Sequence, residues 1–155
     1  YRAPELLLGF KDYGPSVDVW SVGCILAELL QRKSFLCGSS SNQQLKMIID
    51  LVGTPTEADI SNIPEAKIRD FLRSIPIRPP QKLDKKFPKA NPLAIDLLQK
   101  MLTFDTKKRI TIDRALEHPY MKNLHYPEDE PVGEVVTKED FEFEMYDLTK
   151  EQLKD

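Results

Sequence analysis

The stretch SVDVWSVGCILAELL, residues 16–30, decides the fold. Its apolar residues occur almost all the way round a helix, which predicts a helix that is buried on most sides and forms the core of the domain. Ser16 is placed to cap the first turn, and Asp18 puts a negative charge where the helix dipole favours one. Gly23 costs about 1 kcal/mol relative to Ala in a helix interior, so we expect a close backbone neighbour beside it.

The flanking segments predict further helices and no strand. Apolar residues at helical spacing predict a helix over 43–52 that ends at Gly53, and Asn91-Pro92 is typical of a helix start. The apolar face of that second helix is expected to comprise Leu93, Leu97, Leu98, Met101 and Leu102. Shorter helices are predicted within 1–15, after a cap at Thr56, over 66–73 and 111–116, and from a capping box at 149–152. The six prolines between residues 64 and 92 otherwise predict an irregular connection.

Length and composition narrow the class of protein. The chain has 155 residues, 41% hydrophobic and 30% charged, which suits one globular domain. No apolar run approaches the roughly 20 residues of a membrane span, so no membrane association is expected. Cys24 and Cys37 are too few for a disulfide framework, and no His/Cys cluster has zinc spacing, which favours an intracellular setting without a metal site.

Charge is unevenly distributed along the chain. Residues 126–155 hold 11 acidic and 3 basic side chains, a net charge of −8, whereas residues 1–125 hold 14 acidic and 19 basic, a net charge of +5. The basic residues are scattered and not interleaved with aromatic residues, so nucleic-acid binding is not indicated. The acidic tail is either simply solvated or a docking surface for basic peptides.

Five short motifs follow one another in a fixed order. They are Tyr1-Arg2-Ala3-Pro4-Glu5, Asp18-Val19-Trp20-Ser21-Val22-Gly23-Cys24, Gly53-Thr54-Pro55, Lys108-Arg109-Ile110-Thr111 and His118-Pro119-Tyr120. Together they resemble the C-terminal lobe of protein kinases of the cyclin-dependent and mitogen-activated (MAP) group. The resemblance implies a mainly α fold, the helical large lobe without the N-terminal sheet and the catalytic loop. It places the kinase portion at residues 1–121 and an acidic docking segment with a C-terminal extension at 122–155.

The tail distinguishes between the two branches of this group. Residues 124–131 resemble the acidic common-docking segment of MAP kinases, and residues 141–144 and 147–153 resemble their C-terminal extension. The extracellular-signal-regulated type is the most similar, and a cyclin-dependent kinase is disfavoured.

The resemblance assigns architectural and substrate roles. Glu5 is expected to pair with Arg109, since a buried carboxylate needs a partner and Arg offers a bidentate one. Asp18 is either a first-turn residue that suits the dipole, an anchor for the catalytic loop, or both. Tyr1 and Arg2 are expected to border the pocket for the proline after the phosphorylated residue, and Arg2 to contact phosphotyrosine.

Two docking sites are also implied. Glu128, Asp129 and Glu130 are expected to bind Lys and Arg of docking peptides, although Tyr126 stands where these kinases usually carry an acidic residue. A second pocket, for peptides with aromatic residues, is expected at Leu7, Leu8, Leu45 and Phe71. Ser41 and Asn42 replace apolar residues there, so we expect that pocket to work differently from that of its relatives.

The residues that perform phosphoryl transfer are missing from the sequence. It contains no Gly-rich phosphate loop, strand lysine, H-R-D motif or D-F-G motif, and neither His118 nor His125 stands in a catalytic context. The chain, which starts without Met, therefore reads as an inactive fragment with no catalytic, cofactor or metal residues.

The resemblance implies a parent that uses ATP and Mg²⁺, acts on proline-directed Ser/Thr sites, and works in signalling in cytoplasm and nucleus. It implies as partners protein substrates, upstream kinases and phosphatases. The alternative is a non-catalytic, pseudokinase-like binding module.

Overall fold

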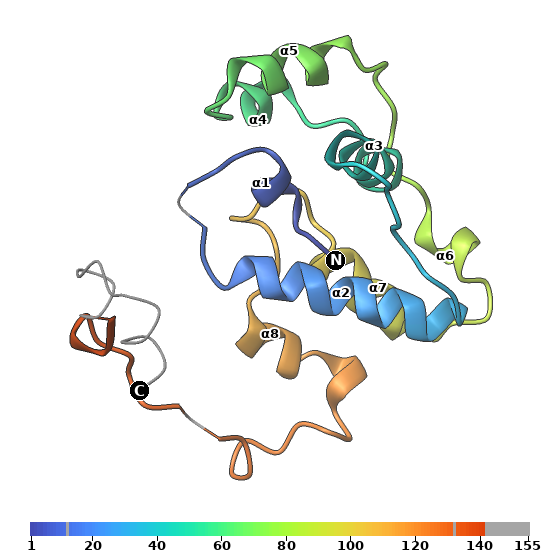
Figure 1. Cartoon of the computed structure of the whole chain (residues 1–155). Helices are drawn as coiled ribbons and strands as arrows, with labels where there is room; N and C mark the ends of the chain where they lie inside the picture. The colour runs from blue at the N-terminus through green and yellow to red at the C-terminus, as the bar shows by residue number, and fades with distance from the viewer. Residues whose placement is uncertain (12, 132, 142–155) are drawn as a thin grey trace. The chain divides into compact units, whose positions relative to one another are not determined.

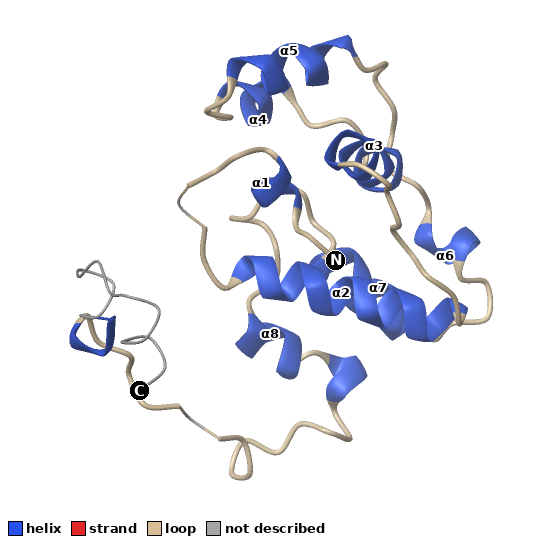
Figure 2. Ribbon diagram, in the orientation of Figure 1, coloured by secondary structure: helices blue, strands red, loops and turns tan. Residues whose placement is uncertain are grey.

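The computed structural model describes residues 1–11, 13–131 and 133–141, and within these ranges it contains helices joined by loops, with no strand (Figure 2). The mainly α fold expected from the sequence is therefore confirmed. The chain forms two compact units, Tyr1–His125 and Tyr126–Asp155. The helices of the first unit are α1 (Pro4–Leu7), α2 (Ser16–Gln31), α3 (Ser41–Val52), α4 (Glu57–Ser61), α5 (Ala66–Ser74), α6 (Leu83–Lys86), α7 (Pro92–Met101), α8 (Ile112–Leu116) and the 3₁₀ helix η1 (Pro119–Met121).

Helix α2 is the central element, and it packs side by side with α7 (Figure 1). A Cβ atom on Gly23 would lie 2.9 Å from Met101 Cβ and 3.0 Å from Leu102 Cδ2. The close neighbour expected beside Gly23 is therefore α7, although its nearest atoms belong to side chains and not to the backbone. The glycine lets the two helices approach, since any side chain there would force α7 away.

Two expectations for α2 are wrong. Ser16 does not cap the helix, because Pro15 is already in the helical region and its carbonyl accepts the N–H of Asp18, which leaves Ser16 inside the first turn. Nor is the helix buried on most sides. Val22, Ile25 and Leu29 are 43%, 46% and 66% exposed. Within the described residues, neighbours cover only one face of α2, so its other face is an apolar stripe open to solvent.

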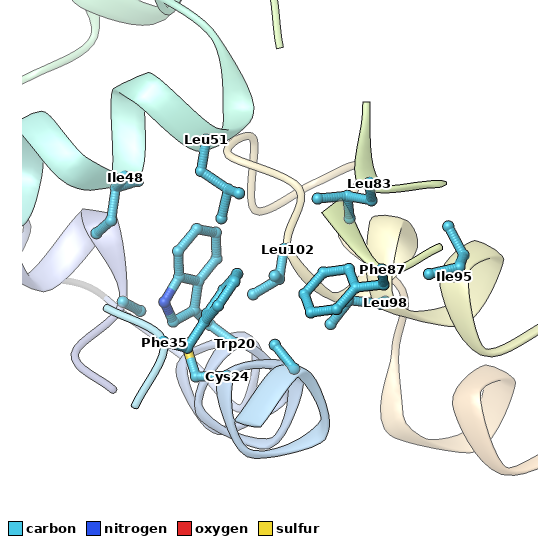
Figure 3. Packing of buried hydrophobic residues seen from close by; sticks show 12 residues of the cluster. Trp20, Cys24, Phe35, Ile48, Leu51, Leu83, Phe87, Ile95, Leu98 and Leu102 are labelled. Carbon is cyan, nitrogen blue, oxygen red and sulfur yellow. The ribbon is translucent and has the colours of Figure 1, made fainter. Parts of the chain in front are cut away.

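The core lies on the covered face of α2. Trp20, Cys24 and Ala27 are fully buried there. In Figure 3 the Trp20 indole lies among side chains from several elements, namely Phe35, Ile48, Leu51 and Leu102. Fully burying one such side chain stabilises the fold by about 1.5–3 kcal/mol, so this cluster joins α2, α3 and α7 into one core.

The longer helices begin and end close to the predicted positions. Helix α3 starts two residues earlier than predicted, because Ser40 caps it through the N–H of Gln43, and it ends at Gly53 with a φ of 89°. Asn91 caps α7 as predicted. Leu93 is exposed and does not belong to the buried face of α7, where Ala94 and Ile95 lie instead.

Most of the shorter helices are confirmed, and two, α6 and the 3₁₀ helix η1, were missed. Thr56 caps α4 in a full capping box with Asp59, and Thr111 caps α8. The connection from 64 to 92 contains α6 in addition to the predicted helix α5. The helix predicted from residue 149 lies outside the described residues. Within the part of the chain that is described, no helix has the length and apolarity to cross a bilayer.

Candidate functional site

The buried charge pair expected between the two ends of the first unit is present. The carboxylate of Glu5 accepts two hydrogen bonds from Arg109, Nη1 to Oε1 at 2.7 Å and Nη2 to Oε2 at 3.0 Å. The side chains are 6% and 0% exposed. A parallel, bidentate arrangement of this kind is the strongest geometry that an arginine–carboxylate pair adopts.

The remaining N–H groups of Arg109 also have partners. They donate to backbone carbonyls of Ser16 (2.8 Å), Thr103 (2.9 Å) and Phe104 (3.3 Å). The guanidinium carbon lies 5.1 Å from the centroid of the Trp20 ring. All five donors of the guanidinium are thus used, which offsets the cost of burying a charge. Arg109 therefore ties α1, the start of α2 and the 103–109 loop together.

Tyr1 and Arg2, which were expected to border a substrate pocket, line an open hollow of about 410 Å³. It is lined by Tyr1, Arg2 and Leu7, by Leu36, and by the loop and first turn at 38–44. Arg2 is exposed, and no hydrogen bond or ion pair to its side chain occurs within the described residues. Its guanidinium therefore has its donors available to an anion, which is compatible with the expected contact to a phosphate group.

Glu28 does not line this hollow but holds Tyr1, which does, and the sequence did not point to it. Its Oε2 accepts the hydroxyl proton of Tyr1 at 2.7 Å, and its Oε1 accepts the N–H of Phe35 at 2.9 Å. These bonds lower the pKa of Glu28, and the hydrogen bond to Glu28 raises the pKa of Tyr1. Nothing in the sequence pairs two residues that are 27 positions apart, so only the fold identifies Glu28 as the group that fixes the Tyr1 ring.

Asp18 lies in the first turn of α2, as predicted, and its side chain is exposed. No hydrogen bond or ion pair to its carboxylate is present in the described part of the chain. The position fits the helix dipole, and the carboxylate is open to further hydrogen bonds. Its role as an anchor for a catalytic loop stays a prediction.

The acidic residues expected to dock peptides lie in the second unit, in a turn in which Asp129 N–H donates to the Tyr126 carbonyl at 2.9 Å. Glu128 and Asp129 are exposed and Glu130 is half-buried. Residues 142–153, most of the segment that resembles the C-terminal extension, lie outside the described residues.

The four residues of the expected second docking pocket do lie together, but mostly inside the protein. Leu8 and Leu45 are only 2% and 3% exposed, because the α4–α5 pair covers them. The covering side chains are Ile60, Ile63 and Leu72. Leu7 and Phe71 alone retain surface, so little of this cluster is open to a peptide.

His118 is the buried histidine of the chain, and its contacts are structural. Its Nδ1 accepts the N–H of Tyr120, and its Nε2 lies 2.8 Å from Asp96 Oδ2, where Lys100 also binds. These contacts fasten η1 to α7. Within the described ranges, no group of three or more His, Cys, Asp or Glu side chains is placed to hold a metal ion.

Known proteins match the chain along its whole length. The family model described as protein kinase domain matches residues 1–121. A mitogen-activated protein kinase of Fusarium vanettenii is 46% identical over 156 residues, covering 99% of this chain and 44% of the relative. Mitogen-activated protein kinase 1 of Oryza sativa subsp. japonica is 47% identical, covering 100% of this chain and 38% of the relative. Extracellular signal-regulated kinase 1 of Dictyostelium discoideum is 46% identical, with coverages of 100% and 29%. The chain thus spans less than half the length of these relatives.

Proposed function

The chain belongs to the protein kinase family, among the MAP kinases, and on that premise we propose that it is the helical part of a proline-directed Ser/Thr kinase. The full protein transfers the γ-phosphoryl group of ATP to protein substrates in signalling, in cytoplasm and nucleus. The observation that carries this proposal is the identity of about 46% to MAP kinases along the whole chain.

In this proposal the chain contributes scaffold and recognition. The Glu5–Arg109 pair holds the segment that starts at Tyr1 onto the helical core, because it joins α1 to the 103–109 loop. The hollow at Tyr1, Arg2 and Leu7 forms one side of the substrate pocket. Glu28 keeps the Tyr1 ring in place beside it.

The exposed face of α2 supports a larger catalytic domain. Val22, Ile25 and Leu29 follow one another at spacings of three and four, so they form one stripe along the helix. An apolar stripe on a central helix is costly to leave exposed to water. Asp18, whose carboxylate is open, lies on the same face of the helix, one turn before Val22. In our proposal the remainder of the kinase domain covers this face, with the catalytic loop against Asp18.

ATP and Mg²⁺ are bound by that remainder in this proposal. We therefore expect the 155-residue chain by itself neither to bind ATP tightly nor to phosphorylate a peptide. The test compares the chain with the full protein in a radiolabelled ATP assay, with Ser-Pro and Ser-Ala peptides as substrates. The full protein should phosphorylate the Ser-Pro peptide preferentially, and the chain should phosphorylate neither.

Two results would contradict this proposal. Turnover by the 155-residue chain would show that its own residues are catalytic. A full protein without activity toward either peptide would favour the alternative, a pseudokinase-like module that only binds partners. That alternative draws its support from Glu128, Asp129 and Glu130, which in either case we propose to dock basic peptides of substrates, upstream kinases and phosphatases.

A further inference from the structure

The connection between α5 and α6 contains a short stretch that is exposed at every residue. Residues 76–82, Pro-Ile-Arg-Pro-Pro-Gln-Lys, form neither helix nor strand, and each is exposed to solvent. We call this stretch the proline segment. Ile77 is 92% exposed, the highest value among the large apolar residues described. The segment is thus a surface peptide, although both of its ends are fixed by helices.

The backbone of the proline segment is biased toward the polyproline II conformation. Ile75 has φ −77° and ψ 133°, and Lys82 has φ −77° and ψ 107°. The three prolines hold φ near −65°, and each residue that precedes a proline is pushed to extended ψ values. The first and second prolines are three positions apart, which is one turn of a polyproline II helix.

Hydrogen bonds to the end of α3 and the loop after it hold the segment in this extended form. Thr54 donates its N–H to the Arg78 carbonyl at 3.0 Å and its hydroxyl to the Pro76 carbonyl at 3.2 Å. Gln81 donates its N–H to the Leu51 carbonyl at 2.9 Å. Gly53 allows the approach, since a Cβ there would lie 2.9 Å from Pro80 N. A partner would therefore meet a segment that is already ordered, and would lose little conformational entropy in binding it.

The alternate carbonyls of the segment are left open. The Pro76 and Arg78 carbonyls accept bonds from Thr54, whereas no described residue donates to the carbonyls of Ile77 or Pro79. Aromatic grooves that read proline-rich peptides stack Trp and Tyr rings on the prolines, and the polar ends of such rings can donate to carbonyls. The surroundings are also basic, since residues 78–89 hold five basic and one acidic side chain, a net charge of +4. Arg78 is paired with Asp50 at 2.6 Å, so the excess positive charge is carried by the lysines of this stretch.

From these observations we propose that the proline segment is a docking site for a protein module with an aromatic-lined groove and an acidic rim. The module grips Pro76 and Pro79, and its acidic rim faces Lys82 and the lysines that follow it, because Arg78 is already paired with Asp50. The proline segment shares no residue with the Tyr1 hollow or with the acidic segment at 128–130, and the proposal does not depend on the kinase activity proposed above.

Titration of the ¹⁵N-labelled chain with a panel of purified SH3 and WW domains, two module types of this kind, tests the proposal. At least one domain should bind and shift the amide signals of Ile77, Arg78 and Gln81. The double substitution Pro76→Ala/Pro79→Ala should weaken that binding by about tenfold or more, because it removes both groove contacts. Pro88→Ala, an exposed proline outside the segment, is the matched control and should bind as the unchanged chain does.

A second variant separates binding from folding. Ile77→Asp changes a side chain that is 92% exposed, and it brings a negative charge toward an acidic rim, so it should weaken binding while leaving the thermal unfolding unchanged. The proposal is overturned if no domain binds the folded chain, even where a synthetic 74–83 peptide binds. It is equally overturned if both variants bind like the unchanged chain, since the prolines would then only stiffen the connection between α5 and α6.

Discussion

Carboxylates near the two ends of the chain have opposite surroundings. Glu5 is buried and accepts two bonds from an arginine that lies over a tryptophan ring, whereas Glu128 and Asp129 are exposed in a turn of the second unit. A buried charge is costly unless every hydrogen-bonding group around it is satisfied, so Glu5 cannot exchange its partner. Exposed charges are screened and weakly held, which suits binding that must be reversible. The same chemical group thus serves architecture in one region and, in our proposal, recognition in the other.

Removing the charge of Glu5 should have the largest effect. Glu5→Gln leaves Arg109 buried without its counter-charge, so we expect the free energy of unfolding to fall by about 3–5 kcal/mol. Urea denaturation of the chain measures this loss. The control is Lys108→Ala, which removes an exposed pair with Asp105 and should cost about 0.5 kcal/mol or less. Equal effects of the two substitutions would break the contrast between buried and exposed charge.

Raising the pH tests whether the core around Arg109 is as dry as this contrast requires. Burial raises the pKa of Cys24 from 9.0 to about 11. Because the unfolded chain loses the thiol proton at lower pH than the folded chain, the stability from this group is complete below pH 9. It is lost as the pH rises to 11, by about 2–3 kcal/mol in all.

The measurement is the urea midpoint at pH 8 and at pH 11 for the unchanged chain and for Cys24→Ala. Cys24→Ala should be less stable than the unchanged chain at pH 8, because the substitution leaves a small cavity. Between pH 8 and pH 11, however, its stability should fall by about 2–3 kcal/mol less, because it has no thiol to titrate. Identical declines in both proteins would mean that the thiol is solvated in the folded state.

Neutralising the acidic segment should leave stability alone and weaken binding. In Glu128→Gln/Asp129→Asn we expect an unchanged urea midpoint and about tenfold lower affinity for a Lys/Arg-rich docking peptide at low salt. Calorimetry at two salt concentrations measures this, and the affinity of the unchanged chain should itself fall with salt. A loss of stability in the variant would mean that these carboxylates, like Glu5, help to hold the fold together.

The smallest effect is expected at Glu28. Its carboxylate lies between the two cases, because it is hydrogen-bonded like Glu5 but less buried. In Glu28→Gln the pKa of Tyr1 should fall back toward its ordinary value of 10.0, since the carboxylate that opposes phenolate formation is gone. NMR titration of the Tyr1 ring follows this change. Glu57→Gln, which removes the partner of Arg73, is the control and should leave the Tyr1 titration where it is. A Tyr1 pKa that stays raised in Glu28→Gln would exclude Glu28 as its cause.

Short-range features of the fold were predictable because their causes are local. Asn91, Thr56 and Thr111 cap helices through N–H groups two or three residues away, and Gly53 ends α3 through its own backbone angle. The wrong prediction of a cap at Ser16 has a local cause too. Pro15 and Ser16 are adjacent and both favour a helix start, and Pro15 already adopts helical angles, so the helix begins one residue before the position that Ser16 would cap.

The site was less predictable. The Glu5–Arg109 contact spans 104 residues, and it was expected only because the motifs around both residues resemble a known family. Tyr1–Glu28 had no such motif and was missed. The second docking pocket illustrates the converse, because the expected residues meet, but the α4–α5 pair buries two of them. Which side of an apolar residue is covered depends on elements far along the chain.

The sequence by itself determined the helical character, the principal caps and the membership of the kinase family, since these depend on neighbouring residues and short motifs. Only the tertiary structure decided which face of α2 is covered, which carboxylate is buried and which is exposed, and that residues 76–82 lie open and extended on the surface. The physical reason is that hydrogen bonds of caps and turns form between near neighbours, whereas burial is a property of the packed chain. Burial in turn sets the strength of every charge interaction described above.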